Sequence, residues 1–344
     1  MENIKVLGID LAKNVFQLHG YSESGKTVLS KAVKRGELVE FVSKLKPCVI
    51  GMEACGGSHH WGRLFEAMGH EVRLVAPQYV KGFVRGNKTD RRDAQAIGEC
   101  VSRPEMRLVA LKTRRQQEIA SMHRVRDRLV RSRTALSNEV RGLLHEFGDV
   151  VGTGMKKLLD ALLLHAGDAE HGLSEDFRSL LIEARVELME LSQKIRGHEQ
   201  QIEKISQASE VCRRLVQVPG VGPITATALV AHVGNARVFK NGREMSAYLG
   251  LVPRQHSSGG KTQLLGITKR GDKSLRRLLI HGARSVVRLS AERNDPLRKW
   301  VHRIELMRGR NKAVVALANK NARILWALIA KGENYRPAQE KLRA

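Results

Sequence analysis

Four acidic side chains in the first hundred residues have the types and spacing for metal-dependent chemistry. Asp10 ends an apolar segment, IKVLGID, and Glu53 ends another, PCVIGME. Asp90 and Asp93 lie three residues apart in TDRRDAQAIGECV, where a helix places both on one face. Mg²⁺ and Mn²⁺ prefer oxygen ligands, and a two-metal site needs several carboxylates from different elements. We therefore predict that these four acids hold Mg²⁺, with Mn²⁺ as the alternative, and catalyse an in-line phosphoryl displacement.

Each acid taken alone has an ordinary explanation. A strand that ends in Gly-x-Asp also occurs in actin-like ATPases and sugar kinases, and Glu53 could be a surface acid. Asp90 and Asp93 could simply stabilise a helix N-terminus through its dipole. The order of the four favours a shared site, because few arrangements need a strand-end Asp, a strand-end Glu and an Asp-x-x-Asp helix so close together.

A second candidate centre is the segment HSSGGK, which we expect to be a flexible loop that carries Ser257 and Ser258 with Lys261 nearby. A serine hydroxyl is a poor nucleophile unless a base or a metal assists it. His256 adjoins, but no His/Asp triad spacing is present, so metals from the carboxylate site are the expected activator. The alternative is a plain Ser-Gly loop.

The segment LVQVPGVGPITATALVAHVG predicts two helices joined by a tight turn, which resembles a helix-hairpin-helix element. Gly220 and Gly222 allow the turn and leave amide groups that can contact phosphate without reading sequence. An ordinary Gly-Pro turn is the alternative. A basic segment, TKRGDKSLRRLL, follows. We expect nucleic acid to contact Gly220, Gly222, Lys261, Lys269, Arg270, Arg276 and Arg277.

The elements that must position these groups fall into three parts. Strand-like and helical segments alternate in the first hundred residues, which indicates a mixed α/β domain. Residues 112–207 keep a heptad pattern, with a glycine-bearing turn or insertion at 148–174, and predict long helices that pair within or between chains. The remainder is basic, punctuated by glycine and rich in helix formers. We place the domains at 1–110, 111–208 and 209–335.

Charge points to a polyanionic partner. The chain of 344 residues has a formal net charge of +25. Residues 211–344 contain 27 Lys and Arg against 7 Asp and Glu, and residues 103–141 contain 11 against 4. Such a surface gains affinity for nucleic acid by releasing counterions. We expect no membrane partner, because neither a long apolar run nor an amphipathic anchor helix is evident.

Cysteine usage and the N-terminus suggest where the protein acts. Cys48, Cys55, Cys100 and Cys212 form no CxxC pair, which is typical of reduced thiols and gives no zinc site. The first residues lack signal-peptide architecture. We expect a cytoplasmic bacterial protein associated with the nucleoid.

Six motifs together resemble one family over essentially the whole chain. GIDLAKNVF, GMEACGG, NKTDRRDA, VPGVGPITA, YLGLVPRQHSSGGK and ITKRGDKSLRRLL occur in the order and spacing found in the DEDD transposases of bacterial insertion sequences, the insertion-sequence one-ten family. The resemblance implies an N-terminal RuvC-like domain of RNase H fold, a helical coiled-coil linker and a mostly α C-terminal transposase domain.

The resemblance also implies roles. The family's four acids match Asp10, Glu53, Asp90 and Asp93, and its nucleophilic serine matches Ser258, with Ser257 one residue away. Such enzymes form a covalent serine–DNA link, exchange strands between donor and target DNA, and are guided by a structured RNA. We expect a recombinase of this kind that acts as a homo-oligomer, a dimer or a tetramer.

Two other classes stay open on the sequence. One is a RuvC-like nuclease that resolves Holliday junctions with the four acids and water, with Ser258 structural. The other is a non-enzymatic nucleic-acid-binding protein. A covalent protein–DNA adduct separates the first from the recombinase, and metal-dependent cleavage excludes the second.

Overall fold

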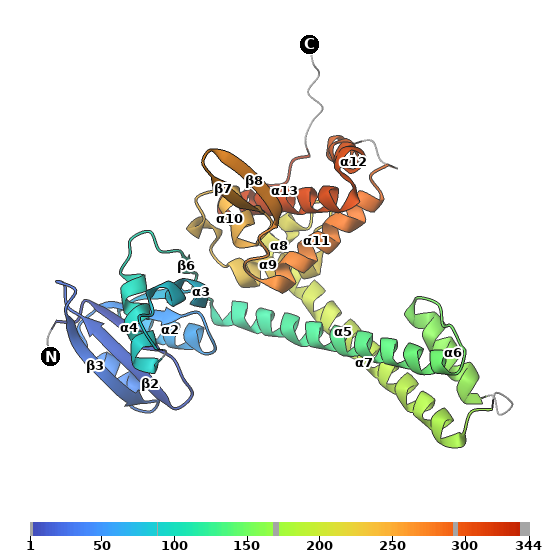
Figure 1. The fold of residues 1–344 in the computed structure, drawn as a ribbon, viewed down its shortest axis with the longest axis horizontal. Helices are drawn as coiled ribbons and strands as arrows, with labels where there is room; N and C mark the ends of the chain where they lie inside the picture. Colours follow the sequence, from blue (N-terminus) through green and yellow to red (C-terminus); the bar gives the residue numbers. More distant parts are fainter. Residues whose placement is uncertain (1–2, 88, 168–171, 292–294, 338–344) are drawn as a thin grey trace, which may run out of the picture. The chain divides into compact units, whose positions relative to one another are not determined.

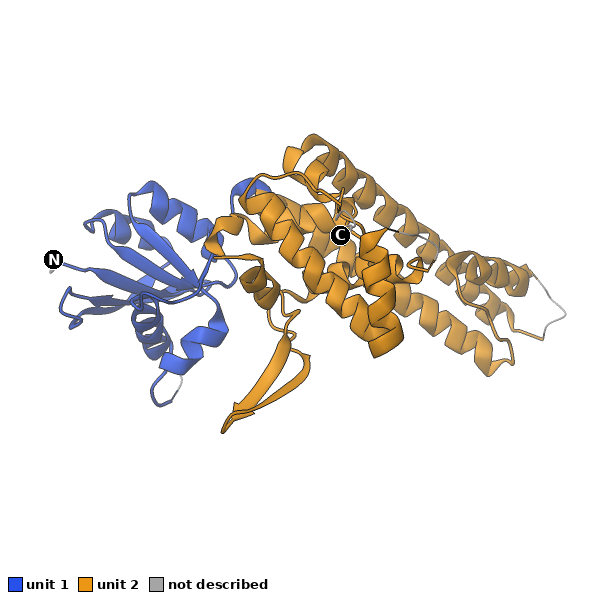
Figure 2. Ribbon diagram, turned by 90° about the horizontal axis from the view of Figure 1, so that it is seen from above, with its two compact units in different colours: residues 1–115 blue, residues 116–344 orange. Residues whose placement is uncertain are grey.

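The structure is a computed structural model that describes residues 3–87, 89–167, 172–291 and 295–337 (Figure 1). It divides into two compact units, residues 1–115 and 116–344 (Figure 2). Unit 1 is built on a mixed sheet and unit 2 is mostly helical, which confirms the coarse fold predicted from the sequence. The three-domain boundaries stay predictions.

Unit 1 contains a six-stranded sheet in the order β3-β2-β1-β4-β5-β6. The apolar segments that end at Asp10 and Glu53 form strands β1 and β4, and strands alternate with helices as the sequence predicts. β1 pairs antiparallel with β2 and parallel with β4, β2 pairs antiparallel with β3, β4 pairs parallel with β5, and β5 pairs antiparallel with β6. The strands are β1 Val6–Asp10, β2 Val15–Tyr21, β3 Thr27–Lys34, β4 Val49–Glu53, β5 Glu71–Val75 and β6 Leu108–Val109.

Alternating side chains divide this sheet into two covered faces. On one face, Leu7, Ile9, Ile50 and Met52 are fully buried in the core cluster that also contains residues of α1 and α2. The opposite face is covered by α4, whose Ile97 packs with the other members of a second cluster. The helices are α1 Leu38–Ser43, α2 Ser58–Ala67, α3 Pro77–Val80, the 3-10 turn η1 Lys81–Phe83, and α4 Asp90–Val101.

Unit 2 begins with the long helices predicted for its first hundred residues. The helices α5 Arg114–Glu146 and α7 Glu175–Ala208 run antiparallel, and α6 Met155–Gly167 forms within the predicted insertion. Antiparallel pairing follows from the contacts: Leu129 packs with Leu191 and Ile195, while Arg126 is ion-paired with Glu199. These long helices confirm the predicted helical region, and coiled-coil packing stays a prediction.

The C-terminal part of unit 2 packs around one large core. It contains α8 Glu210–Leu215, α9 Pro223–Val233, η2 Ala236–Val238, α10 Gly242–Tyr248, α11 Lys273–Arg288, α12 Pro296–Arg308 and α13 Arg310–Ala330. By length and composition alone, α13 is the one described helix that could cross a membrane. Its Leu317, Ala318 and Leu325 are fully buried in the core of unit 2, where a central helix of this composition belongs.

One segment differs from its prediction. HSSGGK is not a plain loop, because β7 Pro253–Ser258 and β8 Lys261–Ile267 form an antiparallel hairpin. Gly259 and Gly260, with φ of 55° and 77°, make the two-residue turn, which needs positive φ at both central positions in the type I′ form. Every residue of β7 is exposed, so no apolar alternation marked the strand in the sequence.

Candidate metal centre and serine hairpin

Glycines allow α4 to lie very close to the sheet. A Cβ on Gly8 would lie 2.2 Å from the Ala94 carbonyl oxygen and 2.6 Å from the Gly98 nitrogen. A Cβ on Gly51 would lie 2.5 Å from a methyl of Val101. Only residues without a side chain permit this approach, which fixes α4 against β1 and β4.

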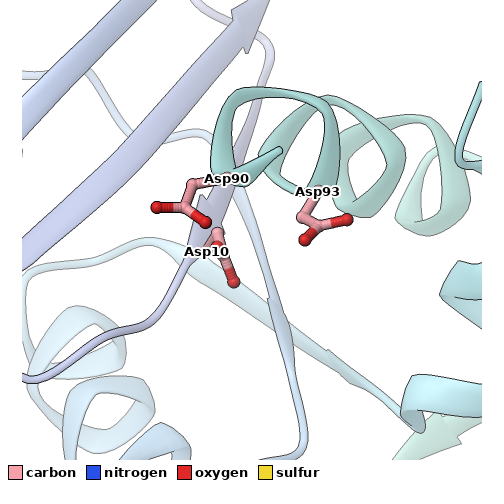
Figure 3. A group of neighbouring side chains, drawn as sticks. All are labelled: Asp10, Asp90 and Asp93. Carbon is pink, nitrogen blue, oxygen red and sulfur yellow. The ribbon is translucent and has the colours of Figure 1, made fainter. Parts of the chain in front are cut away.

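The approach brings three carboxylates together. Asp10 ends β1 on the same face as Gly8, and α4 begins with Asp90 and Asp93 over that strand end (Figure 3). One carboxylate oxygen from each of the three lies within 4.8 Å of the others. Thr89 caps the helix by accepting a hydrogen bond from the Arg92 amide, which fixes the first turn that carries both acids.

Glu53 ends β4, the neighbouring strand, and is outside the group of three that the described residues form. The parallel register pairs Ile9 with Met52, which puts Glu53 beside Asp10 and on the same face of the sheet. The N-terminus of α4 lies over the end of β1, where Asp90 and Asp93 meet Asp10. Burial raises the pKa of the Cys55 thiol, and the charges of Glu53 and Asp10 raise it further.

The group has the composition of a site for a hard divalent cation. Its donors are carboxylate oxygens from a strand end and a helix start, and Asp10 and Asp93 are half-buried while Asp90 is exposed. Like charges at this separation repel strongly, and a bound cation offsets that repulsion. The residues present therefore fit Mg²⁺ or Mn²⁺.

The hairpin of unit 2 places its two serines on opposite faces. Ser257 Oγ accepts a hydrogen bond of 2.8 Å from the side-chain amide of Gln255, two residues earlier on the same face. Ser258 lies on the other face, flanks the glycine turn and pairs across the hairpin with Lys261. Both serines are exposed, and Ser258 is the one directly before the glycine turn at the tip.

The predicted basic residues divide into exposed and structural ones. Lys261, Lys269 and Arg270 are exposed, whereas Arg277 is ion-paired with Asp127 at 2.6 Å. Arg276 has a structural role in this structure, and nucleic-acid binding by it stays a prediction. Its side chain is buried and donates to two carbonyl oxygens, Leu249 O at 3.2 Å and Arg270 O at 2.7 Å. A guanidinium used this way holds the base of the hairpin.

The glycine turn is also partly structural. Gly220 adopts φ of 84°, and a Cβ on it would lie 2.7 Å from the carbonyl oxygen of Gly282 in α11. Gly220 therefore allows close helix packing, and phosphate binding by its backbone stays a prediction. Gly222 is exposed at the start of α9 with open space around it. The α8–turn–α9 segment confirms two helices joined by a tight turn, and phosphate binding by Gly222 stays a prediction.

A row of cations on α13 was not predicted from the sequence. Lys312, Lys320 and Arg323 lie at helical spacing on one side of a largely apolar helix, beside Trp300 of α12. Their spacing of eight and three residues is the signal that could have revealed them.

Two family models match the chain. The model described as the Transposase IS116/IS110/IS902 family matches residues 212–298, which include the serine hairpin. A model described as a transposase, and named for the DEDD transposases of IS110, matches residues 7–148, which include the carboxylates.

Curated relatives are similar over nearly their whole length. The chain is 46% identical to a transposase for insertion sequence element IS1111A of Coxiella burnetii, over 98% of this chain and 92% of the relative. It is 48% identical to a probable family 20 transposase of Pseudomonas aeruginosa, over 97% and 99%. It is 38% identical to a transposase for insertion sequence element IS1328 of Yersinia enterocolitica, over 96% and 98%.

Proposed function

Because the chain belongs to the IS116/IS110/IS902 family of insertion-sequence transposases, we propose that it cleaves and rejoins DNA by metal-dependent phosphoryl transfer. The observation that carries the proposal is the convergence of Asp10, Asp90 and Asp93 within 4.8 Å. We infer a RuvC-like domain of RNase H fold for unit 1. The antiparallel β1–β3 meander followed by parallel β4 and β5 supports this inference.

Asp10, Asp90 and Asp93 would hold the cation, with Glu53 beside them on the next strand end. When bound, Mg²⁺ supplies Lewis-acid polarisation of the phosphoryl group and neutralises developing charge. The carboxylates hold their positions through the strand and helix backbone, which limits reorganisation during the reaction. The chain's contribution at this centre is therefore a rigid set of oxygen ligands.

Ser258 is the nucleophile in this proposal. Its Oγ forms the bond to phosphorus as the bond from phosphorus to the leaving sugar oxygen breaks, and the hydroxyl proton is lost to solvent or to the leaving oxygen. Lys261, directly across the hairpin, would contact the phosphate. The reaction requires a Ser258 to meet the carboxylates, and we propose that it comes from the same chain or from a second copy in a dimer or tetramer.

Guidance by a structured RNA is a further part of the proposal. It is supported by the resemblance and by the exposed basic residues of unit 2, which suit phosphate contacts rather than base readout. Co-purification of a defined RNA encoded beside the gene tests it. Only non-specific RNA in the preparation would argue against guidance.

The metal site has its own test. Mn²⁺ binding to the full chain, measured by calorimetry, should weaken at least tenfold in Asp93→Asn. The same substitution should abolish strand cleavage. Asp176→Asn is a matched control, because Asp176 is likewise an acid in the first turn of a helix. Wild-type Mn²⁺ affinity in Asp93→Asn would remove the site from this carboxylate group.

A further inference from the structure

A groove of about 1370 Å³ lies between the hairpin and the helices α12 and α13, entirely within unit 2. One wall is the stretch of β8 from Leu264 to Ile267, and the other is one side of α13. Neither the carboxylate centre nor Ser258 contributes to its lining. The groove therefore needs an explanation of its own.

The charge of the groove is of one sign. Its lining contains Arg308, Lys312, Lys320 and Arg323, and it contains no Asp or Glu. Among the described residues, none of these four cations forms an ion pair with a carboxylate. Burial and the nearby Arg323 both lower the pKa of Lys320, as expected where cations gather without an anion.

The spacing of the cations suits a chain of phosphates rather than one anion. Lys312 and Arg323 are eleven residues apart on α13, which corresponds to about 16 Å along the helix axis. Lys320 lies between them on the same side of α13. A single small anion would need these side chains to converge, whereas an extended strand uses them one after another.

The remaining lining is aromatic and aliphatic. Trp300 is half-buried in the groove, and Lys320 Nζ lies 4.3 Å from the centroid of its ring, which holds the indole in place. Across from it, Leu264 is 63% exposed and Leu265 is 38% exposed. An aromatic side chain beside a row of cations is the combination that binds unpaired bases together with their phosphates, and the two leucines add apolar surface next to it.

We propose that this groove binds single-stranded DNA. Duplex DNA presents phosphates to the cations but keeps its bases stacked, so it would leave Trp300 and the leucines unused. The choice of DNA rests on the proposed function, in which cleaved strands must be held before they are rejoined. β7 leads from Pro253 at the groove to Ser258 at the tip, about 17 Å away, so a strand seated here would extend toward the nucleophile.

The first test measures binding by the full chain to three labelled probes: a twenty-nucleotide oligothymidine, an oligouridine of equal length, and a twenty-base-pair duplex. Lys312→Ala with Arg323→Ala should weaken oligothymidine binding at least tenfold and duplex binding less than threefold. The matched control is Arg284→Ala with Arg288→Ala, two exposed arginines on one side of α11 outside the groove. Equal losses in the two double variants would overturn the proposal.

The second test concerns the indole. Trp300→Leu keeps an apolar side chain against the core but removes the stacking surface, and should weaken oligothymidine binding about tenfold. Trp300→Phe should restore most of that loss. In the wild type, a 5-iodouracil oligonucleotide should photocrosslink to the tryptic peptide Trp300–Arg303, a readout that does not depend on how any variant folds. A crosslink found only outside the groove would contradict the proposal.

Two outcomes distinguish a failure of the groove proposal from a failure of the proposed function. Asp93→Asn should bind oligothymidine like the wild type, because Asp93 lies outside the groove. A wild-type protein that binds oligothymidine through the groove but shows no metal-dependent strand cleavage would refute the proposed function alone. Tighter binding of oligouridine, lost in the groove variants, would assign the groove to RNA and overturn the choice of DNA.

Discussion

Gly8 of β1 lies so close to Gly98 of α4 that a Cβ on Gly8 would lie 2.6 Å from the Gly98 nitrogen. Gly8→Ala should therefore push α4 away from the strand and separate Asp90 and Asp93 from Asp10. We expect a loss of about 1–3 kcal/mol in the free energy of unfolding, together with loss of strand cleavage. Thermal denaturation and a cleavage assay measure the two effects.

Gly142→Ala is the control for this substitution. Gly142 lies in α5 with open space around it, so alanine should be neutral or stabilise by up to about 1 kcal/mol. Gly8→Ala with a wild-type Tm and full cleavage would mean that the close approach does not hold the acids together.

His123 of α5 should make stability depend on pH. It is buried with its Nε2 3.0 Å from Thr227 Oγ1, and burial, His232 and Arg126 lower its pKa from 6.5 to about 4. Below pH 6.5 the unfolded chain binds a proton that the folded chain resists, so this group destabilises the fold progressively as the pH falls toward 4. The loss is up to about 3 kcal/mol.

His123→Gln keeps a hydrogen-bonding side chain but does not titrate in this range. Its Tm should fall less than that of the wild type between pH 7 and pH 4.5. Above pH 7 the Tm values of the two proteins should change with pH in parallel. Parallel curves for the two proteins over the whole range would show that His123 is not the group responsible.

Exposed cations around the hairpin base should control how binding depends on salt. Lys269→Ala with Arg270→Ala should flatten the log–log salt slope for duplex DNA by up to about 2, which corresponds to two phosphate contacts. A slope unchanged from the wild type, measured by fluorescence anisotropy at several salt concentrations, would place the duplex-binding surface elsewhere.

Arg276 should behave differently from these neighbours. Because its buried guanidinium donates to Leu249 O and Arg270 O, Arg276→Lys should lose at least one of these bonds and destabilise unit 2 by about 1–3 kcal/mol. Thermal denaturation measures this loss. An unchanged Tm in Arg276→Lys would show that the two hydrogen bonds do not hold the base of the hairpin.

Self-association should depend on one exposed side of α7. Leu188 and Leu191 continue the heptad pattern of this region, but both are buried within unit 2 and do not present a surface to a second chain. Ile182, Val186 and Met189 are 52%, 48% and 45% exposed at helical spacing. Replacing these three with Glu should shift the protein toward monomer in light scattering. An unchanged mass distribution would exclude this side of α7.

The sequence predicts the elements that carry the carboxylates, because each element is determined locally. An apolar strand ending at Asp10 and a capped helix carrying Asp90 and Asp93 are each determined by neighbouring residues. Periodicity does not show which strand lies under the start of α4. That strand is β1, and Glu53 of the neighbouring β4 therefore lies beside the group of three carboxylates and outside it.

In unit 2, basic residues and glycines in the sequence predicted the positions of side chains less well. Arg276 lies in a basic run, yet tertiary contacts bury it, which composition cannot reveal. Ser258 lies in a polar segment without apolar alternation, so the glycine pair after it was the only signal of a hairpin turn. The groove depends on residues of α12 and α13 that meet β8 only in the folded unit.

The most direct test of the account is the covalent adduct between Ser258 and DNA. The full chain, with any RNA that co-purifies, is incubated with labelled insertion-sequence DNA and Mg²⁺, run on a denaturing gel, and the linked peptide is mapped by mass spectrometry. The account predicts a metal-dependent adduct at Ser258 that persists in Ser257→Ala and is absent from Ser258→Ala and Asp93→Asn. Cleavage and rejoining by the Ser257→Ala, Ser258→Ala double variant, with no adduct in the wild type, would contradict it.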